Sequence, residues 1–138
     1  MELLKRSGFD FEKHKTKGIP QRLFAEHLIT SGLCLNQSIS WITFNGAIDF
    51  AYLLRSFLGC DLPNEESTFF DYMDIYFGSY FDIKEMKRDI DYLGGGLNKV
   101  SRELGIDRIG TTHQAGSDSM VTCGVFFQLL QSVSKYWD

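Results

Sequence analysis

The stretch His113-Gln114-Ala115-Gly116-Ser117-Asp118-Ser119 indicates the fold of this chain more specifically than any other, and an apolar run from Met120 to Val133 follows it. Gly116 and Ser117 are residue types that commonly precede a helix, and apolar residues recur at helical spacing directly after them. The sequence therefore predicts a helix that has Asp118 in its first turn.

The side chains around this helix start have chemistry that suits a catalytic site. Carboxylates are stabilised near the positive end of the helix dipole, so Asp118 is a candidate metal ligand. His113 precedes it in the incoming loop, and histidine is the residue type whose charge changes near neutral pH, as a general base requires. The alternative is that Asp118 only stabilises the helix end and that His113 is an ordinary loop residue.

A second informative stretch is Trp41-Ile-Thr-Phe-Asn-Gly-Ala-Ile-Asp49-Phe-Ala-Tyr-Leu-Leu54. Residues 40–44 are rich in β-branched and aromatic types, which predicts a short buried strand. Residues 46–58 should form a helix, because apolar side chains recur at its period, at Phe50, Leu53, Leu54 and Phe57. Asp49 then lies just past the carboxyl end of a strand, where open α/β sheets bind ligands.

These two stretches, in this order and with Gly94-Gly-Gly-Leu97 between them, resemble the CCR-associated factor family. That family is the RNA-degrading subunit of the carbon catabolite repression and NOT (CCR-NOT) deadenylase complex. The resemblance runs from about Leu3 to about Phe127. It implies an α/β, RNase H-like exonuclease fold of the DEDD class. It also implies a poly(A)-specific 3′-5′ exoribonuclease, a hydrolase that shortens messenger RNA tails and releases AMP.

The resemblance also implies the cofactors and the roles of site residues. Two-metal phosphodiester hydrolysis needs carboxylates that hold two cations about 4 Å apart, and a base that takes the proton of the attacking water. On the family pattern, Asp49 and Asp118 are the metal ligands and His113 is the base. The expected ions are Mg²⁺ or Mn²⁺, which prefer oxygen ligands, because the sequence has no cysteine and histidine cluster of the kind that binds zinc.

The family pattern includes an Asp-x-Glu pair on the first strand of the fold. Asp10-Phe11-Glu12 has the right letters, but its neighbours resemble a later loop of the family. We therefore expect residues 1–138 to form the carboxyl-terminal part of a single nuclease domain, helix-rich with about two short strands, and to be inactive alone. The alternative is a catalytically inactive interaction module, which also fits Asn-Gly-Ala-Ile at residues 45–48, where the family has His-Ser-Gly-Tyr.

Partners follow from the same resemblance. In the family, the helix predicted after Pro20 docks on the large scaffold subunit, and Glu26 matches a position used there. Ile29 and Gln37 replace the usual Met and Glu. The resemblance implies binding to the scaffold, to a second deadenylase subunit and to the 3′ poly(A) of RNA, in the cytoplasm and nucleus. It identifies no substrate-binding residues.

Composition narrows the alternatives. The chain has 138 residues, 43% of them hydrophobic, which suits one globular domain. Its net charge of −4 disfavours a generic RNA-coating protein, since such proteins carry an excess of Lys and Arg. No apolar run approaches the roughly 18 residues of a membrane span, and no signal peptide is evident at Met1, so we expect a soluble intracellular protein.

Periodicity and breaker residues predict the remaining elements. We expect helices over residues 20–30, 65–77, 84–91 and 97–104, a strand over 80–83, and a solvated basic loop over 9–17. The aromatic residues between positions 69 and 81 should lie in the core, although a base-stacking surface is an alternative. Three apolar-flanked cysteines are expected to be reduced core residues, namely Cys34, Cys60 and Cys123.

Overall fold

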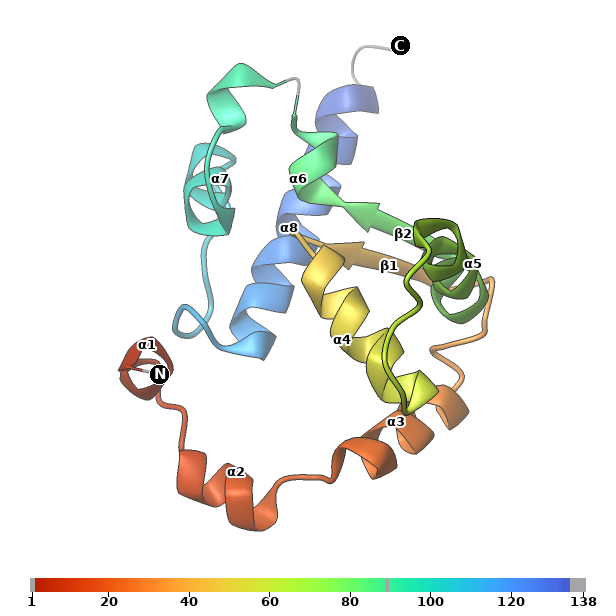
Figure 1. The fold of residues 1–138 in the computed structure, drawn as a ribbon. Coiled ribbons are helices and arrows are strands. Elements are labelled where there is room, and N and C mark those ends of the chain that lie inside the picture. The colour runs from red at the N-terminus through yellow and green to blue at the C-terminus, as the bar shows by residue number, and fades with distance from the viewer. Residues whose placement is uncertain (1, 89, 135–138) are drawn as a thin grey trace. The chain divides into compact units, whose positions relative to one another are not determined.

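The computed structural model describes residues 2–88 and 90–134 (Figure 1). In chain order these residues form α1 (Glu2–Arg6), α2 (Phe11–Lys17), α3 (Gln21–Thr30), β1 (Ser40–Thr43), α4 (Ala47–Leu58), α5 (Glu66–Phe77), β2 (Ser79–Asp82), α6 (Ile83–Met86), the 3-10 helix η1 (Asp91–Leu93), α7 (Leu97–Glu103) and α8 (Ala115–Ser134). The strands β1 and β2 pair in a two-stranded sheet. The predicted helix-rich α/β chain with two short strands is confirmed.

The chain forms two compact units. The first, which we call the α8 unit, consists of Met1–Glu12, Ile42–Phe44 and Asp82–Asp138. The second, the α4 unit, consists of Lys13–Trp41 and Asn45–Phe81. Each unit has a buried apolar cluster of its own. The single nuclease domain expected over residues 1–138 stays a prediction.

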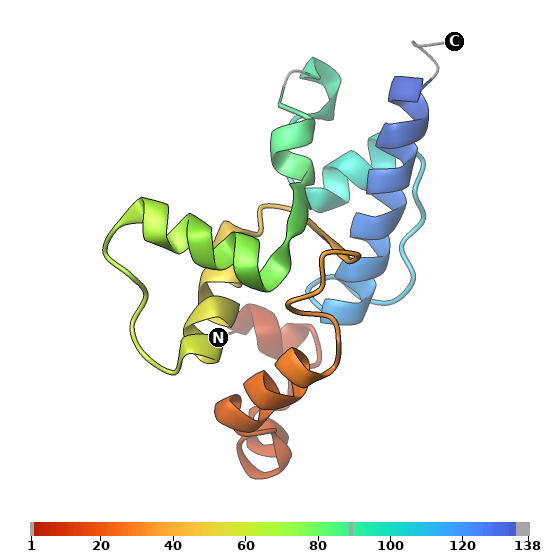
Figure 2. The same cartoon turned by 90° about the vertical axis from the view of Figure 1, so that its right-hand side faces the viewer.

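The core of the α8 unit is built on one face of α8, which runs the length of this unit in Figure 2. The buried side chains of α8 recur at helical spacing, at Val121, Val125, Phe126 and Leu129. They pack against buried residues of α6, η1 and α7, namely Ile83, Leu93 and Val100. Burial stabilises each such side chain by about 1.5–3 kcal/mol, so this contact fixes the position of α8 and of its first turn.

The α4 unit is held by an aromatic cluster between α4 and α5. Phe50 and Phe77 are buried, and their ring centroids lie 4.7 Å apart. The Trp41 ring packs edge-on against Phe77, with centroids 5.4 Å apart. The core position predicted for the aromatic residues between 69 and 81 is confirmed for the buried Phe77 and for the partly buried Phe69, Tyr76 and Tyr80. Phe70 and Phe81 are exposed, so that part of the prediction is wrong.

Several local predictions need correction. Residues 11–17 form the helix α2 and not a loop, because no breaker interrupts them before Gly18 and their terminal charges complement the helix dipole. The helix expected over residues 84–91 is short, since α6 ends at Met86 and η1 begins at Asp91. The strand β1 is only partly buried. Within the described residues there are eight α-helices.

The cysteines are free, as predicted, but only one of them is in the core. Cys34 is buried, and burial raises the pKa of its thiol. Cys60 and Cys123 are exposed, so their prediction as core residues is wrong. Leucines lie two positions from Cys60 and valines two positions from Cys123, but both cysteines are exposed, which flanking residues alone do not reveal. None of the helices that the structure describes is long and apolar enough to cross a membrane.

Adjacent leucines on α8 test which face of this helix is buried. Leu129 is 4% exposed, whereas Leu130 is 43% exposed. We expect Leu129→Ala to lower the free energy of unfolding by about 3 kcal/mol and Leu130→Ala by less than about 1 kcal/mol. Urea denaturation followed by circular dichroism measures both. Equal losses in the two variants would contradict the assignment of the buried face.

Candidate functional site

Asp118 lies in the first turn of α8, as the sequence predicts. The helix begins at Ala115, two residues before the predicted capping residue Ser117, so Ser117 is inside the helix and buried. The backbone N–H of Asp118 donates a 2.9 Å hydrogen bond to the carbonyl oxygen of Gln114. Because α8 is anchored by its core, the backbone at Asp118 is fixed.

Arg108 contacts the Asp118 carboxylate, which sequence analysis did not foresee. The guanidinium Nη1 donates to Asp118 Oδ1 at 2.6 Å and to Ser117 Oγ at 2.8 Å. Its Nη2 donates to Asn98 Oδ1 at 2.5 Å. Charged hydrogen bonds of this kind are stronger than neutral ones. One oxygen of the candidate metal ligand is therefore already neutralised by a cation of the same chain.

His113 is exposed in the loop that enters α8. Its backbone has φ of 64°, in the left-handed region that residues with a side chain seldom adopt. Next to it, the Gln114 side chain Nε2 donates a 2.8 Å hydrogen bond to the carbonyl oxygen of Ser7, which ties this loop to the segment after α1. Strained backbone of this type is common at functional sites. The catalytic role of His113 stays a prediction.

Asp49 lies in the first turn of α4 and is exposed. Its local setting repeats that of Asp118. Asn45 has φ of 63°, and α4 begins two residues later, just as α8 begins two residues after His113. Each candidate ligand therefore follows a left-handed residue and projects from a helix start. Asp49 belongs to the α4 unit, whereas Asp118 and His113 both belong to the α8 unit.

A divalent cation centre needs more donors than either unit offers. Among residues 2–88 and 90–134, no three His, Cys, Asp or Glu side chains are grouped so that they could hold a metal ion. Asp118 moreover has one carboxylate oxygen bound to Arg108. The described residues do not, by themselves, fit a two-cation centre. They offer separate carboxylates to which further ligands would have to be added.

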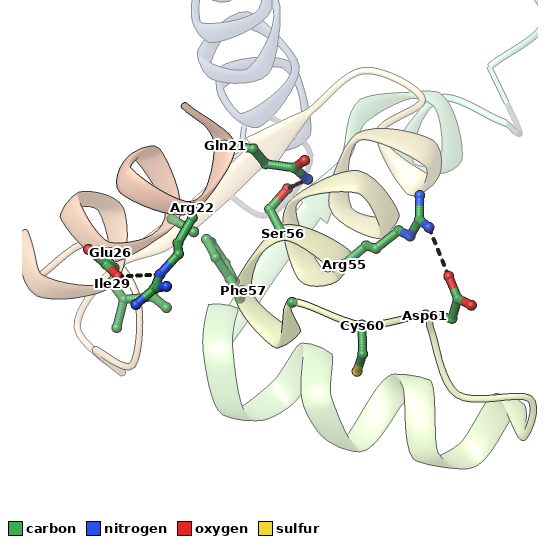
Figure 3. Close-up of a pocket in the computed structure, with 11 residues that line it drawn as sticks. Gln21, Arg22, Glu26, Ile29, Arg55, Ser56, Phe57, Cys60 and Asp61 are labelled. Carbon is green, nitrogen blue, oxygen red and sulfur yellow. Dashed lines mark hydrogen bonds and ion pairs between the residues drawn. The ribbon is translucent and has the colours of Figure 1, made fainter. Parts of the chain in front are cut away.

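A second candidate site is a pocket of about 740 Å³ in the α4 unit, between α3 and the end of α4 (Figure 3). Glu26 and Ile29 of α3 both line it, as do Arg55 and Asp61 around the end of α4. Glu26 Oε1 accepts a hydrogen bond from Arg22 Nε at 3.0 Å, yet its side chain stays 56% exposed. This pocket, named here the α3 pocket, combines charged side chains with apolar Ile29.

Of the three positions at which the resemblance implies contact with a scaffold, two lie together on the α3 pocket. Glu26 and Ile29 are one helical turn apart on α3. Gln37 does not line the pocket. The side chain of Gln37 lies instead close to Gly78, the residue that follows α5. A Cβ added to Gly78 would be 3.0 Å from Gln37 Oε1.

Curated proteins that are similar to this chain match nearly all of it. The chain is 41% identical over 141 residues to a probable CCR4-associated factor 1 homolog 7 of Arabidopsis thaliana, covering 99% of this chain and 51% of the relative. It is 43% identical over 138 residues to the poly(A) ribonuclease pop2 of Schizosaccharomyces pombe, covering 100% of this chain and 40% of the relative. No family model matches the chain.

Solved structures agree with these relatives. The chain is similar to S. pombe Pop2p in a Mg²⁺- and Mn²⁺-bound form, with a TM-score of 0.88 and 44% identity over 93% of this chain and 51% of that one. It is similar to the RNase domain of yeast Pop2, with a TM-score of 0.85 and 30% identity over 94% of this chain and 50% of that one. A structure of yeast NOT1 MIF4G domain co-crystallised with CAF1 matches with a TM-score of 0.79 and 27% identity, over 92% of this chain and 51% of that one.

The fold is therefore that of about half of a Pop2-type RNase domain. The chain belongs to the family of CCR4-associated factor 1 and Pop2 proteins. It spans about half the length, or less, of the curated relatives it matches. The expected correspondence to the carboxyl-terminal half is consistent with this coverage.

The left-handed backbone at His113 gives a test of local strain. We expect His113→Gly to leave the free energy of unfolding unchanged or to raise it by up to about 1 kcal/mol, because glycine adopts this conformation freely. His113→Val should lower it by about 1–2 kcal/mol, since a β-branched side chain is disfavoured there. Chemical denaturation measures both. Equal stability of the glycine and valine variants would show that the loop is not strained.

Proposed function

We propose that this chain supplies Asp49, His113 and Asp118 to a 3′-5′ exoribonuclease that shortens poly(A) tails and releases AMP. The observation that supports this most is Asp118 in the first turn of α8 directly after the His113 loop, in a fold similar to Mg²⁺- and Mn²⁺-bound Pop2p. A poly(A) ribonuclease is also among its relatives. An acidic chain fits this activity better than it fits RNA coating, because cations held by carboxylates neutralise phosphate.

Each residue would contribute a distinct group. Asp49 and Asp118 offer carboxylate oxygens, the ligands that Mg²⁺ and Mn²⁺ prefer. When bound, such cations polarise phosphodiester oxygens and activate water. His113 is exposed and would accept the proton of the attacking water. The strained backbone at His113 fits such a fixed orientation.

The proposed enzyme needs more than these 138 residues. The described residues hold no group of three potential metal-binding side chains, and the relatives are about twice as long. The part that completes the domain would add the Asp-x-Glu pair. Exposed apolar residues on α8 leave a face to which further structure can be added, at Met120, Phe127 and Leu130. Acting on messenger RNA tails, the complete protein would work in the cytoplasm and nucleus.

The activity can be tested on this chain joined to a Pop2-type half that carries Asp-x-Glu. With Mg²⁺ and a 3′-polyadenylated RNA, we expect AMP release from the joined protein and none from the chain alone. Asp118→Asn, Asp49→Asn and His113→Gly should each reduce the rate at least about hundredfold, because each removes a ligand or the base. Chromatography of released nucleotides measures the rate.

Asp71→Asn is a suitable control for this assay, because Asp71 is an exposed carboxylate within α5. It should retain full activity. Undiminished AMP release from Asp118→Asn would remove the assignment. Inactivity of a folded, joined protein without substitutions would instead favour the alternative, a catalytically silent module.

We also propose that the α3 pocket docks a scaffold subunit of a CCR-NOT complex, while a second deadenylase subunit binds elsewhere. The likeness to the CAF1 chain co-crystallised with a NOT1 MIF4G domain supports a scaffold partner. The position of Glu26 and Ile29 on one pocket supports this surface. Because Glu26 is more than half exposed, it is available to a cationic group of a partner.

Charge reversal tests the docking surface. We expect Glu26→Arg to weaken binding of a NOT1-type MIF4G domain at least about tenfold, because like charges across an interface repel. Asp71→Arg, which reverses an exposed charge on α5, should leave the affinity within about twofold. Isothermal titration calorimetry measures both. Docking elsewhere would be indicated if the two variants bound alike, provided circular dichroism shows that α3 is intact.

A further inference from the structure

We propose that Arg108 is a built-in counter-ion of Asp118 and competes with divalent cations for its carboxylate. Arg108 is thus a positioning residue that holds Asp118 while no cation is bound and weakens cation binding. The inference rests on the proposed role of Asp118 as a metal ligand, and it concerns how that ligand is controlled. It also explains one of the two reasons why the described residues do not fit a cation centre, namely that Asp118 Oδ1 is already engaged.

Three hydrogen bonds orient the guanidinium of Arg108. Arg108 donates hydrogen bonds to three side chains on two helices, Asn98 of α7 and Ser117 and Asp118 of α8. The planar guanidinium has its donors in a fixed arrangement, so these three contacts define its orientation. Two of the acceptors are neutral oxygens, which remain in place whether or not the carboxylate is engaged. Arg108 can therefore release Asp118 and keep other partners.

Burial sets this ion pair apart. The side chains of Arg108 and Asp118 are 16% and 36% exposed. In four comparable ion pairs, both side chains are more than half exposed, namely in Arg6–Glu2, Arg22–Glu26, Arg55–Asp61 and Arg88–Glu85. Solvent and salt screen exposed pairs strongly and partly buried ones much less. Solvent and salt therefore screen the Arg108–Asp118 pair less than they screen those four exposed pairs.

The backbone that carries Arg108 is held close to α8. A Cβ on Gly110 would lie 3.4 Å from the Cβ of Ser117, and a Cβ on Gly124 would lie 3.0 Å from Cγ2 of Ile106. Ile106 N also donates to the carbonyl oxygen of Ser101 at 2.8 Å. These contacts flank Arg108 on both sides. A change in its pairing therefore requires rotation of the side chain and not movement of the loop.

The carboxylate itself has one engaged oxygen and one available oxygen. Asp118 Oδ1 accepts from Arg108, whereas Oδ2 accepts no hydrogen bond from the residues that the structure describes. A cation could approach Oδ2, but the guanidinium charge would lie close enough to repel it. Use of both oxygens would require Arg108 to leave. Repulsion between the guanidinium and a divalent ion on the same carboxylate should weaken cation binding about tenfold or more, which corresponds to about 1.4 kcal/mol.

The test is Mn²⁺ binding to the full 138-residue chain, followed by paramagnetic broadening of the backbone amide signals of residues 115–122. Arg108→Gln removes the charge but keeps hydrogen-bond donors, so it should lower the Mn²⁺ concentration at half-broadening about tenfold. Arg108→Lys keeps the charge and should bind like the unsubstituted chain. Arg88→Gln is the matched control, because Arg88 forms an exposed pair with Glu85 in the same unit.

Equal or weaker Mn²⁺ binding by Arg108→Gln would overturn the proposal. If that variant does not fold, the unsubstituted chain still gives an answer with diamagnetic Mg²⁺. Mg²⁺ should shift the carboxylate carbon of Asp118 and the guanidinium resonances of Arg108 with the same concentration dependence. A shift of the carboxylate carbon alone would contradict competition.

The outcome separates this inference from the proposed function. Broadening that survives Asp118→Asn would show that Asp118 is not the ligand, and the proposed site would then fail together with the inference. Broadening that requires Asp118 but is unchanged in Arg108→Gln would overturn only the role of Arg108. Neither result depends on release of AMP, so the test does not require the chain to be active by itself.

Discussion

Burial of one face of α8 is the constraint on which the candidate nuclease site depends. Val121, Val125 and Leu129 are buried against α6, η1 and α7, and they fix the helix within its unit. Because a helix is rigid over a few turns, fixing these residues also fixes the first turn, where Asp118 lies. The charged site is therefore placed by apolar packing one or more turns away, and not by the polar contacts of the site itself.

The two candidate ligands, Asp49 and Asp118, lie in the same kind of local structure. In each case a left-handed residue, Asn45 or His113, ends the incoming segment, a helix begins two residues later, and an aspartate follows in its first turn. The helix dipole stabilises a negative charge at such a position. They differ in their neighbours, since Arg108 pairs with Asp118, whereas Asp49 is exposed. Cations would thus meet one carboxylate that is open and one that is already neutralised.

Local patterns in the sequence predicted most of the elements, although they missed α2 and placed the start of α8 too late. The period of Phe50, Leu53 and Phe57 predicts α4, and the apolar run after Asp118 predicts α8, because side-chain spacing reports helical burial directly. The separation into two compact units was not predicted, nor was the pairing of Arg108 with Asp118. Both depend on contacts between residues distant in sequence, for which periodicity carries no signal.

Local sequence patterns also did not predict which side chains are exposed. Cys123 lies two positions from the buried Val121 and from the buried Val125, yet it is on the exposed side of α8. At the helical period a neighbour in sequence faces another direction, so composition around a residue does not determine its burial. The same reasoning applies to residues 45–48, just before Asp49, which differ from the family pattern. Their chemistry depends on which residues of the completed domain come to lie opposite them.

We propose above that Asp49 and Asp118 each bind a divalent cation once the domain is complete. The most direct measurement is the anomalous scattering of Mn²⁺ in crystals of this chain joined to a Pop2-type half. We expect Mn²⁺ within coordination distance of a carboxylate oxygen of Asp49 and of Asp118, with Arg108 turned away from Oδ1. Mn²⁺ bound without Asp118, or Asp118 still paired with Arg108 in the loaded protein, would contradict it.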